Sequence, residues 1–163
     1  MMNEFIFRKP SASDGFFVSE LIKSCPPLDT NSVYCNLLQC VHFSSTSVVL
    51  QKEGRLVGFV SGYIVPDRKN TLFVWQVAVG EEARGNGMAG KMIDHIIDRE
   101  TSSDLCFIET TITVNNKSSW AVFEKISEKY SAPLSREILF DKEKHFSGQH
   151  DSEMLVRIGP INR

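Results

Sequence analysis

The chain has 163 residues and 42% hydrophobic content, enough for one core, so we predict a single domain over residues 1–163. Its formal charge of −2, with acidic and basic residues interspersed, excludes a cationic nucleic-acid surface and a polybasic membrane patch. No run approaches the roughly 20 apolar residues that cross a bilayer, and residues 1–10 lack a signal-peptide core, so we expect a cytoplasmic protein.

The N-terminal part predicts two helices. The first is capped by Ser13 and ends near Cys25, because two prolines follow and forbid its continuation. Its apolar face consists of Phe17, Leu21 and Ile22. The second helix has Asp29 or Asn31 as its cap. Its apolar stripe recurs every four residues and consists of Val33, Leu37 and Val41, with Tyr34 and Leu38 beside it.

Three strands are predicted next. Residues 46–52 and 55–65 are β-branched and aromatic, and the pair Glu53-Gly54 between them indicates a hairpin. Residues 72–79 form a third strand, which a glycine-rich stretch follows.

The remaining elements alternate between helix and strand. The helix after the glycines has an apolar face of Met88, Met92, Ile93, Ile96 and Ile97. A mostly apolar strand over 105–114 follows, so we expect it to lie parallel to strand 72–79 with a right-handed crossover. Residues 116–130 predict another helix, and residues 134–140 and 153–158 predict two final strands around a polar loop.

Cysteine and histidine spacing gives no metal site. The four cysteines form no Cys-x-x-Cys pair, and the four histidines are scattered without ligand spacing. We therefore predict reduced, mostly buried thiols and no bound metal. Cys106 is better explained as packing than as a nucleophile, so we expect direct transfer chemistry rather than a covalent enzyme intermediate.

The glycine-rich stretch predicts an anion-binding loop. It lies between a strand and a helix and reads Arg84-Gly85-Asn86-Gly87-Met88-Ala89. The two glycines allow consecutive N–H groups to face one pyrophosphate, and the helix adds its unpaired first-turn donors. A Rossmann fingerprint needs a third glycine in register and a Walker loop needs Gly-Lys-Ser/Thr, so neither nucleotide motif matches.

This loop resembles the acyl-CoA loop of the GNAT N-acetyltransferase superfamily, Arg/Gln-x-x-Gly-x-Gly/Ala. Arg84, Gly87 and Ala89 fill its fixed positions. Residues 114–125 resemble a second family hallmark, in which an Asn opens a helix and a Tyr follows seven residues later. Asn116 matches, but Phe123 occupies the position of the Tyr that protonates the CoA thiolate in many members.

The resemblance implies an α/β (α+β) fold with a twisted mixed sheet whose splayed strands hold acetyl-CoA. It assigns the coenzyme to the strand Val77, Ala78 and Val79, to loop residues 84–89, and to Asn116 and Phe123. Phe123 is also explained as a core aromatic, and Asn116 as a helix cap. The family expectation is a homodimer.

Other segments resemble L-2,4-diaminobutyrate acetyltransferases of ectoine biosynthesis. These are residues 26–43, 75–79 and 150–153. The resemblance implies N4-acetylation of L-2,4-diaminobutyrate by direct attack of the amine on acetyl-CoA.

The acceptor carries two ammonium groups and a carboxylate, so its pocket requires acidic, polar and aromatic groups. We assign Asp29 and Glu153 to the amines, one of them as general base, and Tyr34 to the carboxylate or to thiolate protonation. The further candidate contacts are Asn36, Trp75 and His150. Each has an alternative explanation: Asp29 as a helix cap, Trp75 as core, Tyr34 and Asn36 as an amphipathic helix edge, Glu153 as an exposed strand start and His150 as a loop residue.

Two other functions fit the same sequence. One is a GNAT enzyme that acetylates a different amine, such as a polyamine, an antibiotic or a protein amine. The other is a non-catalytic acyl-CoA-binding domain, which the missing tyrosine suggests. An acceptor panel separates the first from diaminobutyrate acetylation, and coenzyme binding without turnover would indicate the second.

Overall fold

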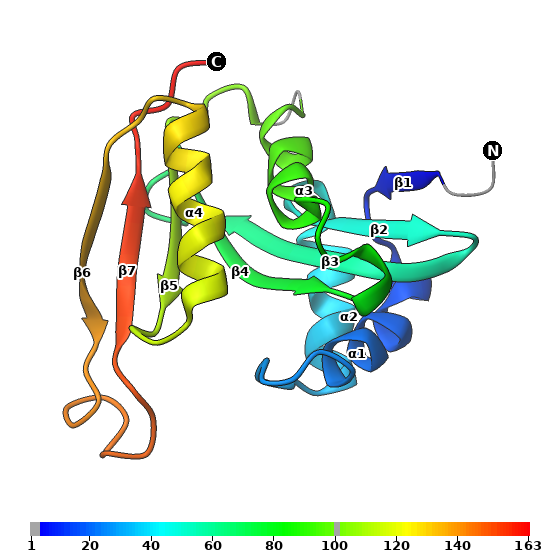
Figure 1. Ribbon diagram of the computed structural model, residues 1–163, viewed down its shortest axis with the longest axis horizontal. Helices are drawn as coiled ribbons and strands as arrows, with labels where there is room; N and C mark the ends of the chain where they lie inside the picture. Colours follow the sequence, from blue (N-terminus) through cyan, green and yellow to red (C-terminus); the bar gives the residue numbers. More distant parts are fainter. Residues whose placement is uncertain (1–3, 100–101) are drawn as a thin grey trace. The chain divides into compact units, whose positions relative to one another are not determined.

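The structure is a computed structural model that describes residues 4–99 and 102–163 (Figure 1). Within these residues, seven strands form one mixed sheet in the order β1-β2-β3-β4-β5-β7-β6. By internal contacts the chain forms two compact units. Unit 1 comprises Met1–Tyr63 and Val74–Ser103, and unit 2 comprises Ile64–Phe73 and Asp104–Arg163. The prediction of a single domain stays a prediction.

Unit 1 begins with three antiparallel strands. β1 (Phe5–Arg8) pairs with β2 (Val48–Lys52), which pairs with β3 (Arg55–Ile64). The hairpin between β2 and β3 turns through Glu53 and Gly54, whose φ angles are 50° and 76°. Two consecutive positive φ angles are typical of the tight turn that Gly at the second position permits, so the predicted hairpin is confirmed. β1 was not predicted because four residues are too few to show a period.

The first predicted helix has a different start and a different buried face. A 3-10 turn, η1 (Ala12–Asp14), precedes α1 (Gly15–Lys23), and Ser11 rather than Ser13 begins it through a capping box with Asp14. The buried side chains of α1 include Val18, Leu21 and Ile22. Phe17 is 59% exposed, so its place on the buried face was wrong.

The second helix, α2 (Val33–His42), also differs from its prediction. Ser32 is the N-cap and accepts a 3.1 Å hydrogen bond from the Cys35 N–H, so neither Asp29 nor Asn31 caps it. The predicted apolar stripe is not the buried one, since Val41 is 51% exposed. The buried residues are Asn36, Gln39 and Cys40. The Asn36 amide donates a 2.9 Å hydrogen bond to the Gln39 side-chain oxygen, which pairs one polar atom of each buried side chain.

The core of unit 1 joins α1 and α2 to the sheet. Its buried cluster consists of Val18, Leu21, Ile22, Cys25, Cys40, Val49, Phe59 and Ala78. A short turn, η2 (Ser44–Thr46), follows α2 and leads into β2. α3 (Met88–Ile97) buries Met88, Met92, Ile93, Ile96 and Ile97, which confirms the predicted apolar face.

Unit 2 contains the parallel strand pair that the crossover pattern predicts. The first residues of β4 (Thr71–Val79) pair in parallel with β5 (Phe107–Ile112), from Thr71 opposite Phe107 to Phe73 opposite Glu109. β7 (Glu153–Ile158) pairs antiparallel with both β5 and β6 (Leu134–Phe140). α4 (Lys117–Lys129) buries Phe123 and Ile126.

A buried carboxylate links three segments of unit 2. Glu109 on β5 is 1% exposed and forms ion pairs with Arg68, from the loop before β4, and with Arg157 on β7. The Arg157 guanidinium also lies 3.7 Å from the centre of the Phe107 ring. A buried carboxylate requires such partners, because an unpaired charge in a core is strongly destabilising.

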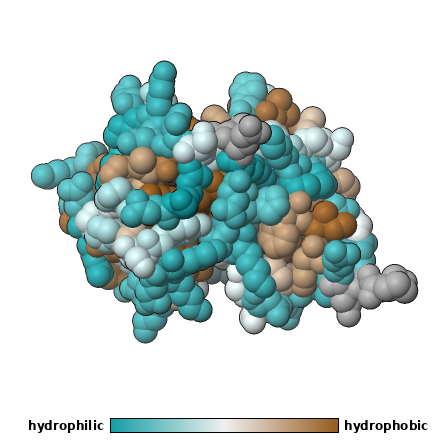
Figure 2. Space-filling view, turned by 90° about the horizontal axis from the view of Figure 1, so that it is seen from above, coloured by the Kyte–Doolittle hydropathy of each residue, from teal (hydrophilic) through white to brown (hydrophobic). Residues whose placement is uncertain are grey.

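Hydrophilic residues predominate on the face shown in Figure 2, with apolar residues in separate small patches, in keeping with the interspersed charges. No helix within residues 4–99 and 102–163 is long and apolar enough to cross a membrane.

Candidate functional site

The loop between β4 and α3 has the backbone that an anion site requires. After β4 ends at Val79, a short turn, η3 (Glu81–Ala83), leads into the glycine-rich stretch. Gly85 and Gly87 adopt φ angles of 80° and 66°, in the left-handed region that favours glycine. Gly87 is the N-cap of α3, and the Lys91 N–H bonds to its carbonyl at 3.2 Å. The amides that precede Lys91 in the first turn therefore have no helical acceptor.

The surface over this loop is open. A Cβ placed on Gly85, Gly87 or Gly90 would meet no atom within 4 Å, and residues 84–87 are exposed. Arg84 turns back so that its Nε donates to the Val79 carbonyl at 3.0 Å, and the Asn86 amide donates to the Arg84 carbonyl at 3.2 Å. The helix start, with its unpaired main-chain donors, thus follows an open and exposed loop, as at helix N-termini that bind phosphate.

The strand residues assigned to the coenzyme differ in what they can offer. Ala78 is fully buried in the core, so only its main chain is available. The Val79 carbonyl already accepts from Arg84 and from the Cys25 thiol at 3.6 Å. Residues 71–73 of β4 pair with β5, and Val77 and Val79 lie further along β4, beyond these paired residues.

Unit 1 presents three of the candidate acceptor residues at its surface. Tyr34 on α2 is 69% exposed, Trp75 on β4 is 45% exposed, and Asp29 is exposed in the loop before α2. The exposure of Trp75 argues against the core-packing alternative, and its ring meets Tyr63 edge-on at 6.3 Å. Asn36 is fully buried and donates its amide to Gln39, so it lies beneath the surface of α2.

Unit 2 brings the other two acceptor candidates together. His150 lies just before β7, and Glu153 is its first residue. The His150 Nε2 is 3.9 Å from a Glu153 carboxylate oxygen, and its ring lies 4.6 Å from the Phe146 ring. The Glu153 side chain is 20% exposed, so this carboxylate is partly shielded yet accessible.

The family's second hallmark has a clear structural explanation in unit 2. Asn116 caps α4, because its side chain accepts a 3.2 Å hydrogen bond from the Ser119 N–H. Phe123 is 2% exposed, as the core-aromatic explanation requires. Neither observation tests coenzyme contact, which stays a prediction for both residues.

Two of the four cysteines, Cys35 and Cys40, are poor nucleophiles because their thiols stay protonated. All four are free thiols, and Cys25 and Cys40 are buried. Burial raises the pKa of Cys40 to about 12 and also raises the pKa of Cys35. A thiol with a raised pKa stays protonated at neutral pH, which disfavours a covalent acetyl-cysteine route at these two residues.

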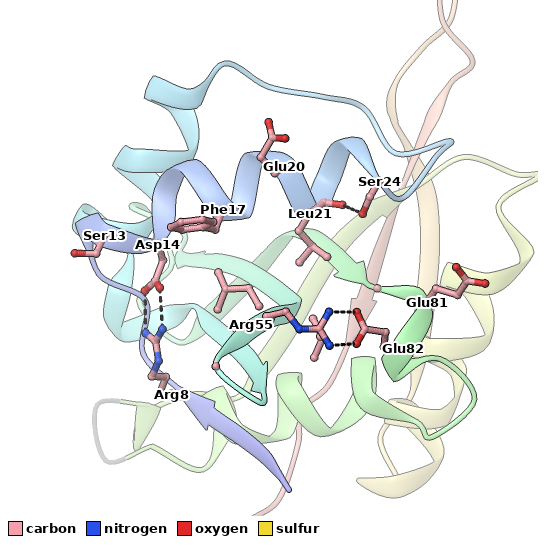
Figure 3. Close-up of a pocket in the computed structure, with 14 residues that line it drawn as sticks. Arg8, Ser13, Asp14, Phe17, Glu20, Leu21, Ser24, Arg55, Glu81 and Glu82 are labelled. Atoms are coloured by element: carbon pink, nitrogen blue, oxygen red, sulfur yellow. Dashed lines mark hydrogen bonds and ion pairs between the residues drawn. The ribbon is translucent and has the colours of Figure 1, made fainter. Parts of the chain in front are cut away.

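A separate groove of about 600 Å³ lies in unit 1 between α1, the β2–β3 hairpin and η3 (Figure 3). Two ion pairs line it, Arg8 with Asp14 and Arg55 with Glu82. Hydrogen bonds from Arg8 lower the pKa of Asp14. The lining residues include none of the acceptor or coenzyme candidates.

Sequence reasoning missed Gln76. This β4 residue is 8% exposed, and its amide bonds to both the Asp29 carbonyl and the Asn31 side chain. A glutamine inside an otherwise apolar strand was the available signal, since a buried amide needs partners.

Comparison with known proteins decides the family. The profile of the Acetyltransferase (GNAT) family matches residues 16–127. The chain belongs to this acetyltransferase family. Within the GNAT family it is 54% identical over 153 residues to the L-2,4-diaminobutyric acid acetyltransferase of Methylotuvimicrobium alcaliphilum, covering 94% of this chain and 89% of that protein. The Vibrio parahaemolyticus enzyme of the same name is 46% identical, over 95% of this chain and 86% of that enzyme.

A solved GNAT structure matches almost the whole fold. Diaminobutyrate acetyltransferase EctA from Paenibacillus lautus, in complex with L-2,4-diaminobutyric acid and coenzyme A, superposes with a TM-score of 0.93 at 36% identity. The match covers 99% of this chain and 98% of that one. The predicted α/β sheet architecture is therefore confirmed as the GNAT fold.

Proposed function

We propose that this GNAT enzyme transfers the acetyl group of acetyl-CoA to the 4-amino group of L-2,4-diaminobutyrate, giving N4-acetyl-L-2,4-diaminobutyrate for ectoine biosynthesis. The observation that carries the proposal is the likeness over nearly the full chain to an enzyme solved with this amine and coenzyme A. Relatives at 45–54% identity bear the same enzyme name.

The open glycine loop supports the donor side of the proposal. We assign the coenzyme's pyrophosphate to the main-chain N–H groups of 85–89, with Arg84 beside them. The left-handed φ angles at Gly85 and Gly87 are of the kind that lets consecutive amides face one anion. The pantetheine arm is assigned to main-chain groups of Val77, Ala78 and Val79, as expected for the family. Asn116 and Phe123 keep their assignment to the same coenzyme.

The chemistry is one direct displacement. The neutral 4-amine attacks the thioester carbonyl, a C–N bond forms, and the carbonyl electrons move onto oxygen. The tetrahedral adduct then collapses, the C–S bond breaks, and CoA leaves as its thiolate. A main-chain N–H at β4 would stabilise the oxyanion by about 3 kcal/mol. The nitrogen's proton passes to a carboxylate, and the thiolate takes up a proton.

Asp29 and Glu153 are the proposed partners of the two amino groups. Both are accessible carboxylates, and one of them removes the proton of the attacking amine, directly or through water. Because a free alkyl amine has a pKa near 10, this deprotonation is needed at neutral pH. Tyr34 and Trp75 supply an exposed hydroxyl and an aromatic wall, and His150 is a further proposed contact. Asn36 is fully buried, so we propose no direct contact of its side chain with the acceptor.

Phe123 cannot protonate the departing sulfur. The proton then comes from water or from Tyr34, and a thiol with a pKa near 8.5 is already a fair leaving group. The absence of a tyrosine at position 123 therefore changes which group protonates the CoA thiolate, and the displacement stays feasible.

An acceptor panel tests the proposal. Release of free CoA thiol is measured with acetyl-CoA and equal concentrations of diaminobutyrate, ornithine, lysine and spermidine, and the product is located by NMR. We expect the highest kcat/KM with diaminobutyrate and acetylation at N4. Activity on diaminobutyrate no higher than on the other amines would refute it. Thermal stabilisation by CoA with no turnover on any amine would indicate a non-catalytic binding domain.

We also propose a single-domain homodimer in the cytoplasm, where acetyl-CoA is available. β6 is an edge strand with residues 135–140 all exposed, including Ile138, Leu139 and Phe140. An apolar edge of this kind favours pairing with a second copy. Light scattering is expected to give twice the chain mass, and Ile138→Lys to shift it toward the monomer.

A further inference from the structure

The loop between α1 and α2 contains Asp29, to which the proposed function gives an amino group of the acceptor. Residues 29–32 belong to no helix or strand, and α2 begins only at Val33. The conformation of residues 29–31 (the acceptor segment) must therefore come largely from contacts with other parts of unit 1. These contacts decide where the Asp29 carboxylate lies.

Gln76 on β4 contacts the acceptor segment at two points. Its Nε2 donates to the Asp29 carbonyl at 3.1 Å, and its Oε1 accepts from the Asn31 side-chain amide at 3.2 Å. Because a carbonyl only accepts, the Asp29 contact fixes which end of the Gln76 amide faces it. No other side chain of similar size offers one donor and one acceptor at this spacing, so neither Glu nor Leu can replace both bonds.

Through Gln76, Asp29 is connected to strand β4, on which Trp75 also lies. Gln76 directly follows Trp75 in the sequence, and the Trp75 ring lies edge-on to the Tyr63 ring. The Gln76 side chain itself is 8% exposed, so it lies beneath the surface and the Gln76 end of both part-buried bonds is shielded from water. Shielded hydrogen bonds hold geometry more firmly than exposed ones.

We propose that Gln76 is a positioning residue for acceptor selection, which fixes the acceptor segment relative to Trp75. This inference rests on the proposed function, since it takes Asp29 and Trp75 as acceptor contacts. Without the two Gln76 hydrogen bonds, the acceptor segment samples several conformations, and acceptor binding must order it at a cost in entropy. The loss is expected in acceptor affinity, because the coenzyme loop is built from different residues.

The test compares Gln76→Leu with Thr46→Val. Thr46 is also 8% exposed and loses one buried hydrogen bond, to the Gly62 carbonyl, away from the acceptor segment. Gln76→Leu is expected to raise the diaminobutyrate KM about 10- to 30-fold, with kcat and CoA affinity changed less than about threefold. Thr46→Val is expected to lower Tm and leave the KM unchanged.

Asn31→Ala provides a second variant at a half-exposed position, should Gln76→Leu not fold. It removes one of the two bonds, so a smaller rise in KM of about threefold is expected. In the double variant with Gln76→Leu, the Asn31 substitution is expected to add almost nothing, because its partner is already gone. Hydrogen exchange in residues 28–32 is expected to be faster in both single variants and unchanged in Thr46→Val.

The outcomes separate the inference from the function on which it rests. If the unaltered enzyme does not prefer diaminobutyrate, the proposed function fails. If it does, but Gln76→Leu lowers only Tm or kcat with an unchanged KM, Gln76 is merely structural and the positioning role is refuted. Additive effects of Asn31→Ala and Gln76→Leu on the KM would also refute it.

Discussion

The coenzyme loop and the acceptor segment of unit 1 are built in opposite ways. Loop 84–90 offers main-chain amides in left-handed glycine conformations, with open space above them. The acceptor segment instead depends on a distant side chain, Gln76, that donates to one of its residues and accepts from another. A donor common to many enzymes can be bound by backbone alone, whereas a particular amine requires side chains held in place by tertiary contacts.

The largest effect is expected from substituting Asp29 and Glu153, and it shows which of the two carboxylates is the general base. Changing the general base to an amide, by Glu153→Gln or Asp29→Asn, is expected to lower kcat about 100-fold or more. The other substitution is expected mainly to raise the diaminobutyrate KM. Steady-state kinetics and calorimetry with CoA make the comparison, and CoA affinity is expected to stay within about twofold for both. An equal loss of CoA affinity would break the division between the two regions.

Gly87→Ala tests the main-chain character of the coenzyme loop. A methyl group at this φ of 66° meets no protein atom but enters the space assigned to the pyrophosphate. We expect CoA binding to weaken about 30-fold by calorimetry, equivalent to roughly 2 kcal/mol.

Gly54→Ala is the matched control, since the hairpin glycine has a φ of 76° and equally open surroundings. Both substitutions carry a similar backbone cost of about 1 kcal/mol. Weaker CoA binding in the hairpin variant as well would assign the effect to strain rather than to the loop.

Arg84→Gln sharpens the same point by removing a positive charge, together with the Nε hydrogen bond to the Val79 carbonyl. Its guanidinium is exposed, so the expected loss in CoA affinity is smaller, about 5- to 10-fold, and it diminishes as salt is added. The diaminobutyrate KM is expected to stay unchanged. A change in acceptor KM without a change in CoA affinity would contradict the assignment.

The smallest expected effect on catalysis comes from Asp14, in the groove apart from both regions. Asp14→Asn breaks its ion pair with Arg8 and is expected to lower the unfolding free energy by about 1–2 kcal/mol with kcat/KM unchanged. Arg8 lowers the pKa of Asp14, so the folded state binds this proton less tightly than the unfolded state. The contribution is therefore full above about pH 4 and is lost as the pH falls further.

Denaturant titrations at pH 7 and pH 3 measure this contribution. The unaltered protein and Asp14→Asn are expected to differ in stability at pH 7 and to differ less at pH 3. A constant difference at both pH values would contradict the assignment to the ion pair.

Much of the fold followed from local signals. The hairpin at Glu53-Gly54, the apolar face of α3 and the last two strands depend on short-range patterns, and all match the structure. The face of α2 did not follow, because two of its buried side chains, Asn36 and Gln39, are polar and bond to one another. Tertiary contacts of this kind leave no period in the sequence.

The candidate site shows the same division between short-range sequence patterns and tertiary contacts. The glycine positions predicted the loop conformation because only a few residues adopt positive φ without cost. The acceptor side was predicted from resemblance, and the structure adds Gln76 through two hydrogen bonds that span 45 and 47 positions of the chain. A glutamine inside an apolar strand indicates that partners are needed, but no short-range pattern identifies Asp29 and Asn31 as those partners.

The buried ring of Phe123 has a consequence for which acyl donors the enzyme can use. An oxygen ester expels an alkoxide, which needs a proton during bond cleavage, whereas a sulfur anion departs unaided because its conjugate acid is far stronger. A benzene ring supplies no such proton. The protein is therefore expected to discriminate sharply in favour of thioesters over matched oxoester analogues of its donor.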